Sequence, residues 1–318
     1  MIPKLLGKRI NEKFALLQKR RPLSAAVVAK LKEQFSIELT YNSNAIEGNK
    51  LTLKETYFVV NDGITVKGKS FKDHLEAKNH LEAVHYLEEL IDAKRRVTIS
   101  EILIRSLQKM IIQNIEDHGA GKYRQGRVLI TGSKHQPADA YQVPALMEDF
   151  MAWIHKESQR LHPVELAAIA HHKLVYIHPF DDGNGRTARL LMNLILMRSG
   201  YPIVVILKND RSKYYRVLDQ ADRGNYSDLC KFVAQAVERS LNIYLKALPE
   251  DSMITVKYAQ QSALVPLSEL AKHSRFSEKY LNLLARSGKL DAHKEGRKWL
   301  SSRQALKRYL ETRERKRI

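Results

Sequence analysis

The segment 178–189 limits the folds open to this chain more than any other stretch, because it places a glycine-rich turn directly before a helix. It reads His-Pro-Phe-Asp-Asp-Gly-Asn-Gly-Arg-Thr-Ala-Arg and continues into the apolar run Leu-Leu-Met. The first turn of a helix has unpaired backbone N–H groups and the positive end of the helix dipole. With two arginines beside it, this turn predicts a polyphosphate site. Asp182 offers the hard oxygen that Mg²⁺ prefers, and His178 suits a general base near neutral pH.

The charge of the chain is concentrated at its two ends. The 318 residues carry a formal net charge of +19, with 8 basic and 1 acidic residue in 1–30 and 16 basic and 6 acidic residues in 252–318. A nearly neutral middle suggests a globular enzyme, flanked by segments that could meet nucleic acid or another acidic surface. For the N-terminal cluster, a solvated basic face is an equally good interpretation.

Cysteine usage and hydropathy favour an intracellular protein. Cys230 is the only cysteine, which excludes an intramolecular disulfide and favours a reducing compartment. Neither the N-terminus nor any other stretch has the long apolar run of a signal sequence or a membrane span. We therefore expect a cytoplasmic location.

Most of the chain has apolar residues at three- and four-residue intervals, which predicts a mainly α-helical fold. Residues 52–55 read as a capping box, Pro163 suits a first helical turn, and Gly200 would end the helix that follows the glycine-rich turn. Segment 127–137 reads as a short β-hairpin lying against the helices. Residues 249–251, Pro-Glu-Asp, break the helical pattern and predict a domain boundary.

The C-terminal segment resembles a small winged helix-turn-helix domain of the excisionase or MerR kind. Helices are expected at 266–271, 277–287 and 303–311, with a basic and apolar stretch at 289–300 as the wing. In this resemblance 277–287 is the recognition helix. Basic side chains of the helix and wing would contact DNA: Lys279, Arg286, Lys294, Arg297 and Lys298. Winged helices also bind proteins, so both partners stay open.

The pattern His-Pro-Phe-x-Asp/Glu-Gly-Asn-Gly-Arg-x-x-Arg matches 178–189 at every fixed position, so the chain resembles the Fic family. This resemblance implies a Fic/DOC core and a protein adenylyltransferase, which moves AMP from ATP to a Ser, Thr or Tyr hydroxyl of a target protein. His178 would accept the hydroxyl proton, and Asp182 would hold Mg²⁺. The nucleotide would be bound by the remaining fixed residues, Gly183, Asn184, Gly185, Arg186 and Arg189.

Segment 43–49, Ser-Asn-Ala-Ile-Glu-Gly-Asn, resembles the inhibitory pattern Ser/Thr-x-x-x-Glu-Gly/Asn of class II members of this family. Ser43 and Glu47 would share one face of a helix that Gly48 ends. By the resemblance Glu47 pairs with Arg189 and excludes the γ-phosphate, because a carboxylate and a triphosphate compete for one guanidinium. Some relatives also use this glutamate to remove AMP, so a second catalytic role for Glu47 stays open.

The resemblance also implies a base pocket and a target-binding flap. Tyr215 matches the family's adenine-side tyrosine, and Asp222 stands where an asparagine is common. A carboxylate accepts hydrogen bonds but does not donate them unless protonated, so this difference affects base preference. The flap, which would pair with an extended target segment through main-chain bonds, includes Val128, Leu129, Ile130 and Thr131.

We therefore expect an N-terminal helical region at 1–95, a Fic core at 96–248 and a winged helix-turn-helix domain at 252–318. The expected function is autoinhibited AMP transfer, with ATP and Mg²⁺ as ligands and a protein, and possible DNA, as partners. The resemblance leaves a homodimer open, because relatives often dimerise. Two alternatives are a DNA-binding regulator whose Fic core senses nucleotide and an enzyme that removes AMP.

Overall fold

The computed structural model divides the chain into two compact units, Met1–Leu248 and Pro249–Ile318, which we call the N-terminal and C-terminal units. The division falls where the Pro-Glu-Asp break predicts a boundary, although residues 249–251 themselves lie outside the described part. The structure describes residues 1–93, 98–130, 135–248, 264–272, 274, 276–287, 289–295 and 298–314. No helix in these ranges is long and apolar enough to cross a bilayer.

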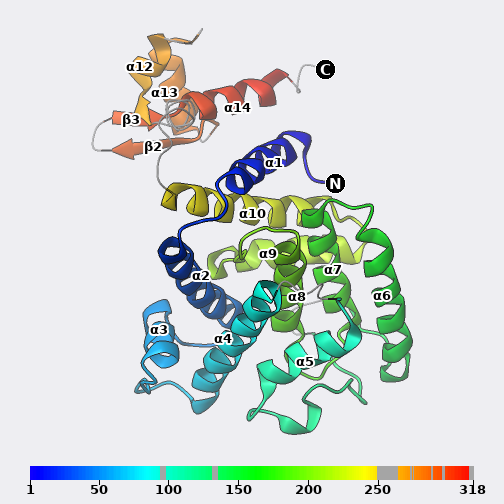
Figure 1. Ribbon diagram of the computed structural model, residues 1–318. Helices are drawn as coiled ribbons and strands as arrows, with labels where there is room; N and C mark the ends of the chain where they lie inside the picture. Colours follow the sequence, from blue (N-terminus) through cyan, green and yellow to red (C-terminus); the bar gives the residue numbers. More distant parts are fainter. Residues whose placement is uncertain are drawn as a thin grey trace. The chain divides into compact units, whose positions relative to one another are not determined.

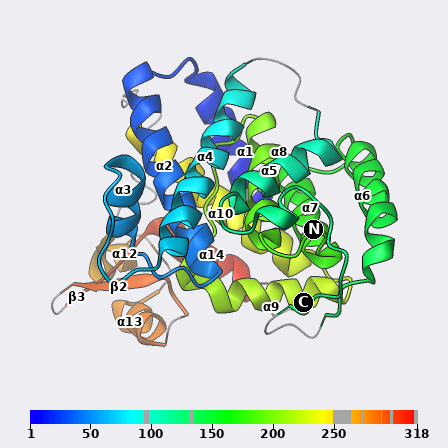
Figure 2. The same ribbon diagram turned by 90° about the horizontal axis from the view of Figure 1, so that it is seen from below.

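The N-terminal unit is helical, as predicted. Its α-helices are α1 (Lys4–Lys19), α2 (Ala25–Ile46), α3 (Leu53–Asn61), α4 (Phe71–Asp92), α5 (Glu101–Ile112), α6 (Val143–Glu157), α7 (Pro163–Ile177), α8 (Asn184–Arg198), α9 (Arg211–Asp222) and α10 (Ser227–Ala247). Three short 3-10 helices are η1 (Asp117–Gly119), η2 (Ala140–Gln142) and η3 (Lys208–Asp210). In both views α6 lies at one edge of this unit and α3 at the opposite edge (Figures 1 and 2).

Helix α8 forms the centre of the N-terminal unit. It contacts α2, α4, α5 and α7, and its residues from Ala188 to Leu196 are buried on all sides. Such all-round burial is expected of a helix whose apolar residues follow no single stripe. The first turn of α8 is therefore fixed in space by the core around it.

Local signals set several helix boundaries as predicted. Thr52 and Glu55 form the capping box at the start of α3, and Pro163 is the first residue of α7. Gly200, with φ 86°, follows the end of α8, and Gly48, with φ 103°, follows the end of α2. A left-handed residue just past a helix favours glycine.

The predicted region 1–95 shares its hydrophobic core with 96–248. Buried Leu6, Ile10 and Leu17 of α1 belong to the same cluster as the apolar residues of α7, α8 and α10. Glu238 of α10 joins α1 through Arg9 Nε at 2.7 Å and Lys13 Nζ at 2.6 Å. The N-terminal helices and the predicted core thus form one compact body.

The C-terminal unit has a small core of its own. Its elements are β1 (Val265–Pro266), α12 (Leu267–Lys272), α13 (Glu278–Arg286), β2 (Ala292–Glu295), β3 (Lys298–Ser301) and α14 (Arg303–Glu314). The strands form an antiparallel sheet in the order β1-β3-β2. The three predicted helices are present, and stretch 289–300 contains the β2–β3 pair; Gly288, Gly296 and Arg297 lie outside the described residues.

The segment expected to form a hairpin has no assigned strand in its described part. Residues 127–130 and 135–139 are neither helix nor strand, and residues 131–134, which include Thr131, lie outside the described ranges. The hairpin at 127–137 therefore stays a prediction.

Candidate active site

The turn between α7 and α8 contains two left-handed backbone positions. His178, which follows α7, has φ 50°, and Gly183, which precedes α8, has φ 84°. A Cβ at Gly183 would also lie 3.1 Å from Ile112 Cγ2. The predicted glycine-rich turn at a helix start is thus confirmed, and it leaves the first N–H groups of α8 without intrahelical acceptors.

The Asn184 side chain shapes this turn, and its predicted part in nucleotide binding stays a prediction. Its Oδ1 accepts from the Phe180 N–H at 3.0 Å, and its Nδ2 donates to the Phe180 carbonyl at 2.7 Å. Phe180 is fully buried and Asn184 nearly so. Both ends of the amide thus bind the turn, which fixes the orientation of the Asn184 side chain.

His178 offers one ring nitrogen as a base. Its Nδ1 lies 3.2 Å from the Val175 carbonyl oxygen, which can only accept, so the hydrogen of this contact belongs to Nδ1 and the lone pair to Nε2. Burial lowers the pKa of His178 below its ordinary value. The ring is therefore neutral at pH 7 and able to accept a proton at Nε2.

Arg124 holds the backbone at His178, a role that sequence reasoning missed. Its buried guanidinium donates to the carbonyl oxygens of His178 at 2.8 Å, Gly126 at 3.0 Å and Ala138 at 2.5 Å. One side chain thus joins the loop after α7 to both ends of segment 126–138. No local pattern marks Arg124, because its partners are main-chain atoms, and those of Ala138 and His178 lie 14 and 54 positions away in sequence.

Arg189 is enclosed by the end of α2. Its Nη2 lies 2.7 Å from Glu47 Oε1 and 2.8 Å from the Ser43 carbonyl oxygen, and its Nε donates to Ser43 Oγ at 2.9 Å. Burial acts to lower the pKa of Arg189, but the Glu47 carboxylate outweighs it and raises that pKa. The predicted contact between Glu47 and Arg189 is therefore present, across 142 residues of sequence.

Gly185 leaves room for the Glu47 carboxylate. A Cβ at this position would lie 2.3 Å from Glu47 Oε1 and 3.2 Å from Arg189 Nη1. The carboxylate thus occupies the space directly beside the first turn of α8. This is the space that the predicted phosphate site needs.

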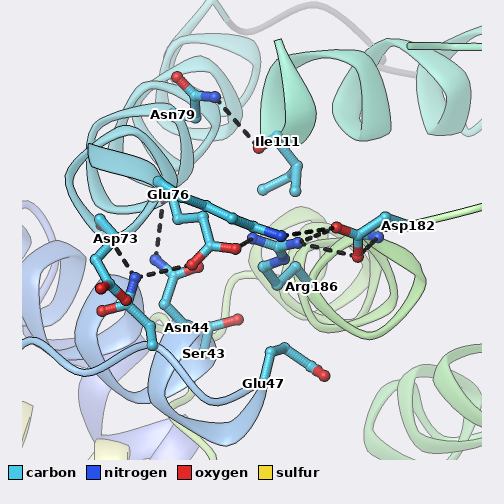
Figure 3. A network of polar contacts seen from close by, with 12 residues as sticks. Ser43, Asn44, Glu47, Asp73, Glu76, Asn79, Ile111, Asp182 and Arg186 are labelled. Atoms are coloured by element: carbon cyan, nitrogen blue, oxygen red, sulfur yellow. Dashed lines mark hydrogen bonds and ion pairs between the residues drawn. The ribbon is translucent and has the colours of Figure 1, made fainter. Parts of the chain in front are cut away.

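Arg186 lies between two carboxylates (Figure 3). Its Nη1 is 3.0 Å from Glu76 Oε1, and its Nη2 is 3.2 Å from both oxygens of Asp182. Burial acts to raise the pKa of Asp182, but Arg186 and the Gly183 N–H outweigh it and lower that pKa. Asp182 is consequently ionised, and its side chain stays 38% exposed. Glu76 was not among the predicted site residues.

Tyr214 is a second polar neighbour of Arg189 that the pattern did not reveal. Its hydroxyl lies 2.9 Å from His171 Nε2 and 3.4 Å from Arg189 Nη1. The buried face of α9, Tyr214, Val217, Leu218 and Ala221, has helical spacing, and this period could have indicated that Tyr214 points inward.

The two predicted base-pocket residues do not line one cavity. Tyr215 lies at the end of α2, with its hydroxyl 3.5 Å from the Ile46 carbonyl oxygen. Asp222 contacts His172 Nε2 at 2.8 Å and lines a cavity of about 340 Å³, whose lining does not include Tyr215. The aromatic residues of this cavity are Phe150, Trp153, Tyr176 and Tyr226.

Of the predicted flap residues, Leu129 is the most exposed, at 86%, and Val128 and Ile130 are half-buried. Behind the described part of the flap, the His135 ring stacks on Tyr176 with centroids 3.8 Å apart. Tyr176 also lines the cavity of Asp222. His135 thus contacts a residue of α7 that lines this cavity and comes two positions before His178.

Comparison with known proteins identifies the family. The model of the Fic/DOC family matches residues 98–196. A Fic domain containing signaling protein from Bacteroides thetaiotaomicron is 33% identical, with a TM-score of 0.68 over 75% of this chain and 96% of that structure. This chain belongs to the Fic/DOC family.

Other Fic/DOC proteins extend the similarity. Fic-1 from C. elegans (residues 134–508) is 31% identical, with a TM-score of 0.69 over 76% of this chain and 72% of that one. The protein adenylyltransferase Fic of Drosophila virilis is 36% identical over 269 residues, or 82% of this chain and 54% of the relative. The chain thus spans about half the length of the curated relatives it matches.

The family match covers α5 to most of α8. It therefore includes Arg124, His178, Arg186 and Arg189. Glu47, Glu76 and Tyr214 lie outside the matched residues. The site is completed by elements before and after the region that defines the family.

Proposed function

We propose that this protein transfers AMP from ATP to a Ser, Thr or Tyr hydroxyl of a target protein. The observation that carries the proposal is one assembly at the start of α8: a neutral His178 with a free Nε2, an ionised Asp182, and two buried arginines. The adenylyltransferase names of the Drosophila relatives support it.

The geometry suits an in-line displacement at the α-phosphorus. The target hydroxyl gives its proton to His178 Nε2 while its oxygen forms a bond to phosphorus, and the bond to the pyrophosphate oxygen breaks. Arg186, Arg189 and the first N–H groups of α8 bind the β- and γ-phosphates and stabilise the charge that develops on the leaving group. The Gly183 and Gly185 backbone permits close approach of these phosphates.

Asp182 fits the Mg²⁺ that accompanies ATP. Its carboxylate is ionised and partly exposed, and Mg²⁺ bound to a nucleotide needs only one or two carboxylates beside the phosphates. In the described part of the chain no group of three or more metal-ligating side chains occurs, which agrees with a metal shared with substrate. When bound, Mg²⁺ would neutralise charge on the pyrophosphate.

In this proposal two residues flank the adenine base of ATP. Tyr215 lies beside the end of α2, and Asp222 lines the aromatic cavity. Asp222 Oδ1 binds His172, so its remaining oxygen is an acceptor for an N–H group of the base. The flap residues Val128, Leu129 and Ile130 would bind the target main chain.

Glu47 would inhibit this reaction, which makes the protein a class II member. Its carboxylate holds Arg189 and fills the space over Gly185, so a bound γ-phosphate would have to displace it. Ser43 supports the same arginine from the preceding turn.

The test uses Glu47→Gly with alpha-labelled ATP and Mg²⁺, alone and with cell lysate. Removing the carboxylate should raise labelling of protein at least tenfold over wild type, because Arg189 becomes free for phosphate. The control Glu47→Gly, His178→Ala should lose the label by about 10²-fold or more. Absence of label from Glu47→Gly would contradict AMP transfer, and release of AMP from a pre-modified target would then favour AMP removal.

We further propose that the C-terminal unit is a winged helix-turn-helix that binds DNA. Lys279 and Arg286 are exposed on α13, and Lys294 and Lys298 are exposed on the β2–β3 pair. Phosphate contacts make affinity fall steeply with salt. Fluorescence anisotropy with duplex DNA should show that the affinity falls as the salt concentration rises. It should also show a loss of affinity in the double variant Lys279→Ala, Arg286→Ala. The control Lys246→Ala, which changes an exposed lysine of α10, should bind as wild type does; equal binding by wild type, the double variant and this control would contradict DNA recognition.

Cytoplasmic location and homodimerisation stay predictions.

A further inference from the structure

Glu76 of α4 connects two parts of the site through its two carboxylate oxygens. Oε1 is 3.0 Å from Arg186 Nη1, and Oε2 accepts from Asn49 Nδ2 at 2.9 Å. The side chain is only 10% exposed, so both contacts form away from water. Figure 3 shows Glu76 between the Arg186 side chain and the segment that contains Ser43 and Glu47.

Two asparagines attach segment 43–49 to α4. Asn44 Nδ2 donates to the Glu76 carbonyl oxygen at 3.1 Å, and Asn49 Nδ2 donates to the Asp73 carbonyl oxygen at 3.0 Å. Asn49 Oδ1 accepts from the Leu51 N–H at 3.0 Å, which fixes the orientation of its amide. Because these asparagines come three residues before and two residues after Glu47, they determine where the Glu47 carboxylate lies.

We propose that Glu76 is a positioning residue shared by the phosphate site and the inhibitory segment. It orients Arg186 toward phosphate with one oxygen and, through Asn49, holds Glu47 over Gly185 with the other. This inference rests on the proposed function for its meaning, but it names residues that lie outside the family's sequence pattern at 178–189. It makes the strength of inhibition depend on a contact of α4 rather than on Glu47 and Arg189 alone.

The two contacts can be separated by substitution. Glu76→Gln keeps a carbonyl oxygen for Asn49 but loses the charge that attracts Arg186, and its amide can turn N–H groups toward the guanidinium. Asn49→Leu keeps the volume of the side chain but removes the donor to Glu76 and the Asp73 carbonyl oxygen and the acceptor for the Leu51 N–H. The first change should affect phosphate binding, and the second should affect inhibition.

The matched control for Asn49→Leu is Asn79→Leu. Asn79 is also a buried asparagine that donates to carbonyl oxygens, those of Ile111 at 3.3 Å and Gln113 at 2.7 Å, but its partners belong to α5 and the residue after it. Figure 3 shows it further along α4 than Glu76, away from Glu47. Any general effect of losing a buried amide should be common to both variants.

The inhibition experiment compares transfer rates with and without Glu47. The ratio of the Glu47→Gly rate to the rate with Glu47 present measures inhibition. Asn49→Leu should reduce this ratio at least about twofold, the lower end for loss of one hydrogen bond, because its bonds to Glu76, Asp73 and Leu51 are all lost, and it should leave the Glu47→Gly rate unchanged. Asn79→Leu should leave the ratio unchanged. An unchanged ratio in Asn49→Leu, or an equal reduction in both, would overturn the proposal.

The phosphate experiment measures affinities by calorimetry in the Glu47→Gly protein. Glu76→Gln should weaken ATP binding about tenfold, because Arg186 loses its orienting partner, but should leave AMP binding unchanged since AMP has no β- or γ-phosphate. Equal weakening for ATP and AMP would indicate a merely structural role and contradict the proposal.

Measurements of ATP affinity test this inference independently of the proposed AMP transfer. With Glu47 present, Asn49→Leu should tighten ATP binding two- to tenfold, whether or not AMP is transferred. If Glu47→Gly binds ATP but labels no protein, AMP transfer fails while the positioning role of Glu76 is still decided by these affinities.

Discussion

Three arginines are buried in the part of the N-terminal unit that the structure describes, and each has different partners. Arg124 donates to carbonyl oxygens, Arg186 lies between Glu76 and Asp182, and Arg189 binds Glu47 and Ser43. A buried charge is tolerated only with such partners, so each guanidinium is held in one orientation. In the proposed function Arg186 and Arg189 bind phosphate, whereas Arg124 binds the main chain.

Replacing Arg124 by methionine should lower kcat rather than nucleotide affinity. The variant keeps an apolar stem but leaves the carbonyl oxygens of His178, Gly126 and Ala138 without their donor. The proposed general base, His178, therefore loses its fixed position. In the Glu47→Gly protein we expect kcat to fall at least about tenfold and the Kd for ATP to change little.

A matched control for this prediction is Arg105→Met. Arg105 Nε donates to the Gly121 carbonyl oxygen at 2.7 Å rather than to the carbonyl oxygen of His178. Steady-state kinetics and ATP calorimetry on both variants decide the matter. Equal loss of kcat in the two would show that Arg124 has no particular relation to His178.

Helix boundaries were the elements best predicted from sequence, because their signals are local. The capping box at Thr52, Pro163 at the start of α7 and Gly48 after α2 each act within one turn. The strand-like composition of 127–130 did not produce an assigned strand. Branched and aromatic residues indicate a half-buried surface, and pairing depends on a partner that local sequence does not specify.

Docking of α1 on α10 should depend on Glu238. Burial acts to raise the pKa of Glu238, but Arg9 and Lys13 outweigh it and lower that pKa to about 2. Its contribution to stability is therefore present above the ordinary pKa near 4.5 and lost as the pH falls toward 2. At pH 7, Glu238→Gln should lower the free energy of unfolding by about 1–3 kcal/mol in urea titrations.

The control for Glu238 is Glu12→Gln on α1. Glu12 makes an exposed pair with Lys8 at 3.9 Å, and such pairs contribute on the order of 0–1 kcal/mol. If both variants unfold at the same urea concentration as wild type, the ion pairs of Glu238 do not hold α1.

The N-terminal unit as a single cooperative body should lose stability in mild acid. Burial lowers the pKa values of His80 and His171 well below 6.5, with nearby Arg189 acting in the same direction. Below pH 6.5 these two histidines are therefore protonated in the unfolded chain but stay neutral in the folded chain. Stability is full above pH 6.5 and falls below it, by up to about 1.4 kcal/mol per pH unit for each histidine, until the folded-state pKa is reached.

Urea unfolding between pH 7.5 and 5.5 measures this slope. His80→Gln should reduce it, while His85→Gln, which removes an exposed histidine of the same helix, should leave it unchanged. A slope that is the same in wild type and His80→Gln would contradict the assignment.

Long-range partners were the part of the site that the sequence could not specify. The contact of Glu47 with Arg189 was expected only through the family resemblance, and Arg124, Glu76 and Tyr214 were not predicted. Their partners lie across the fold, as with Glu76 and Arg186, which are 110 positions apart in the numbering. Periodicity indicates which face is buried but not which buried face it meets.

The close approach of Glu47 to Gly185 restricts how a constitutively active allele can arise. Any side chain at 185 large enough to expel the carboxylate would occupy the volume that the triphosphate must enter, because a Cβ there already lies 2.3 Å from Glu47 Oε1. Substitutions that relieve the proposed inhibition are therefore expected among the residues that position the Glu47 carboxylate rather than at Gly185. Selection for activity should leave Gly185 intact and accumulate changes in segment 43–49 and its supports on α4.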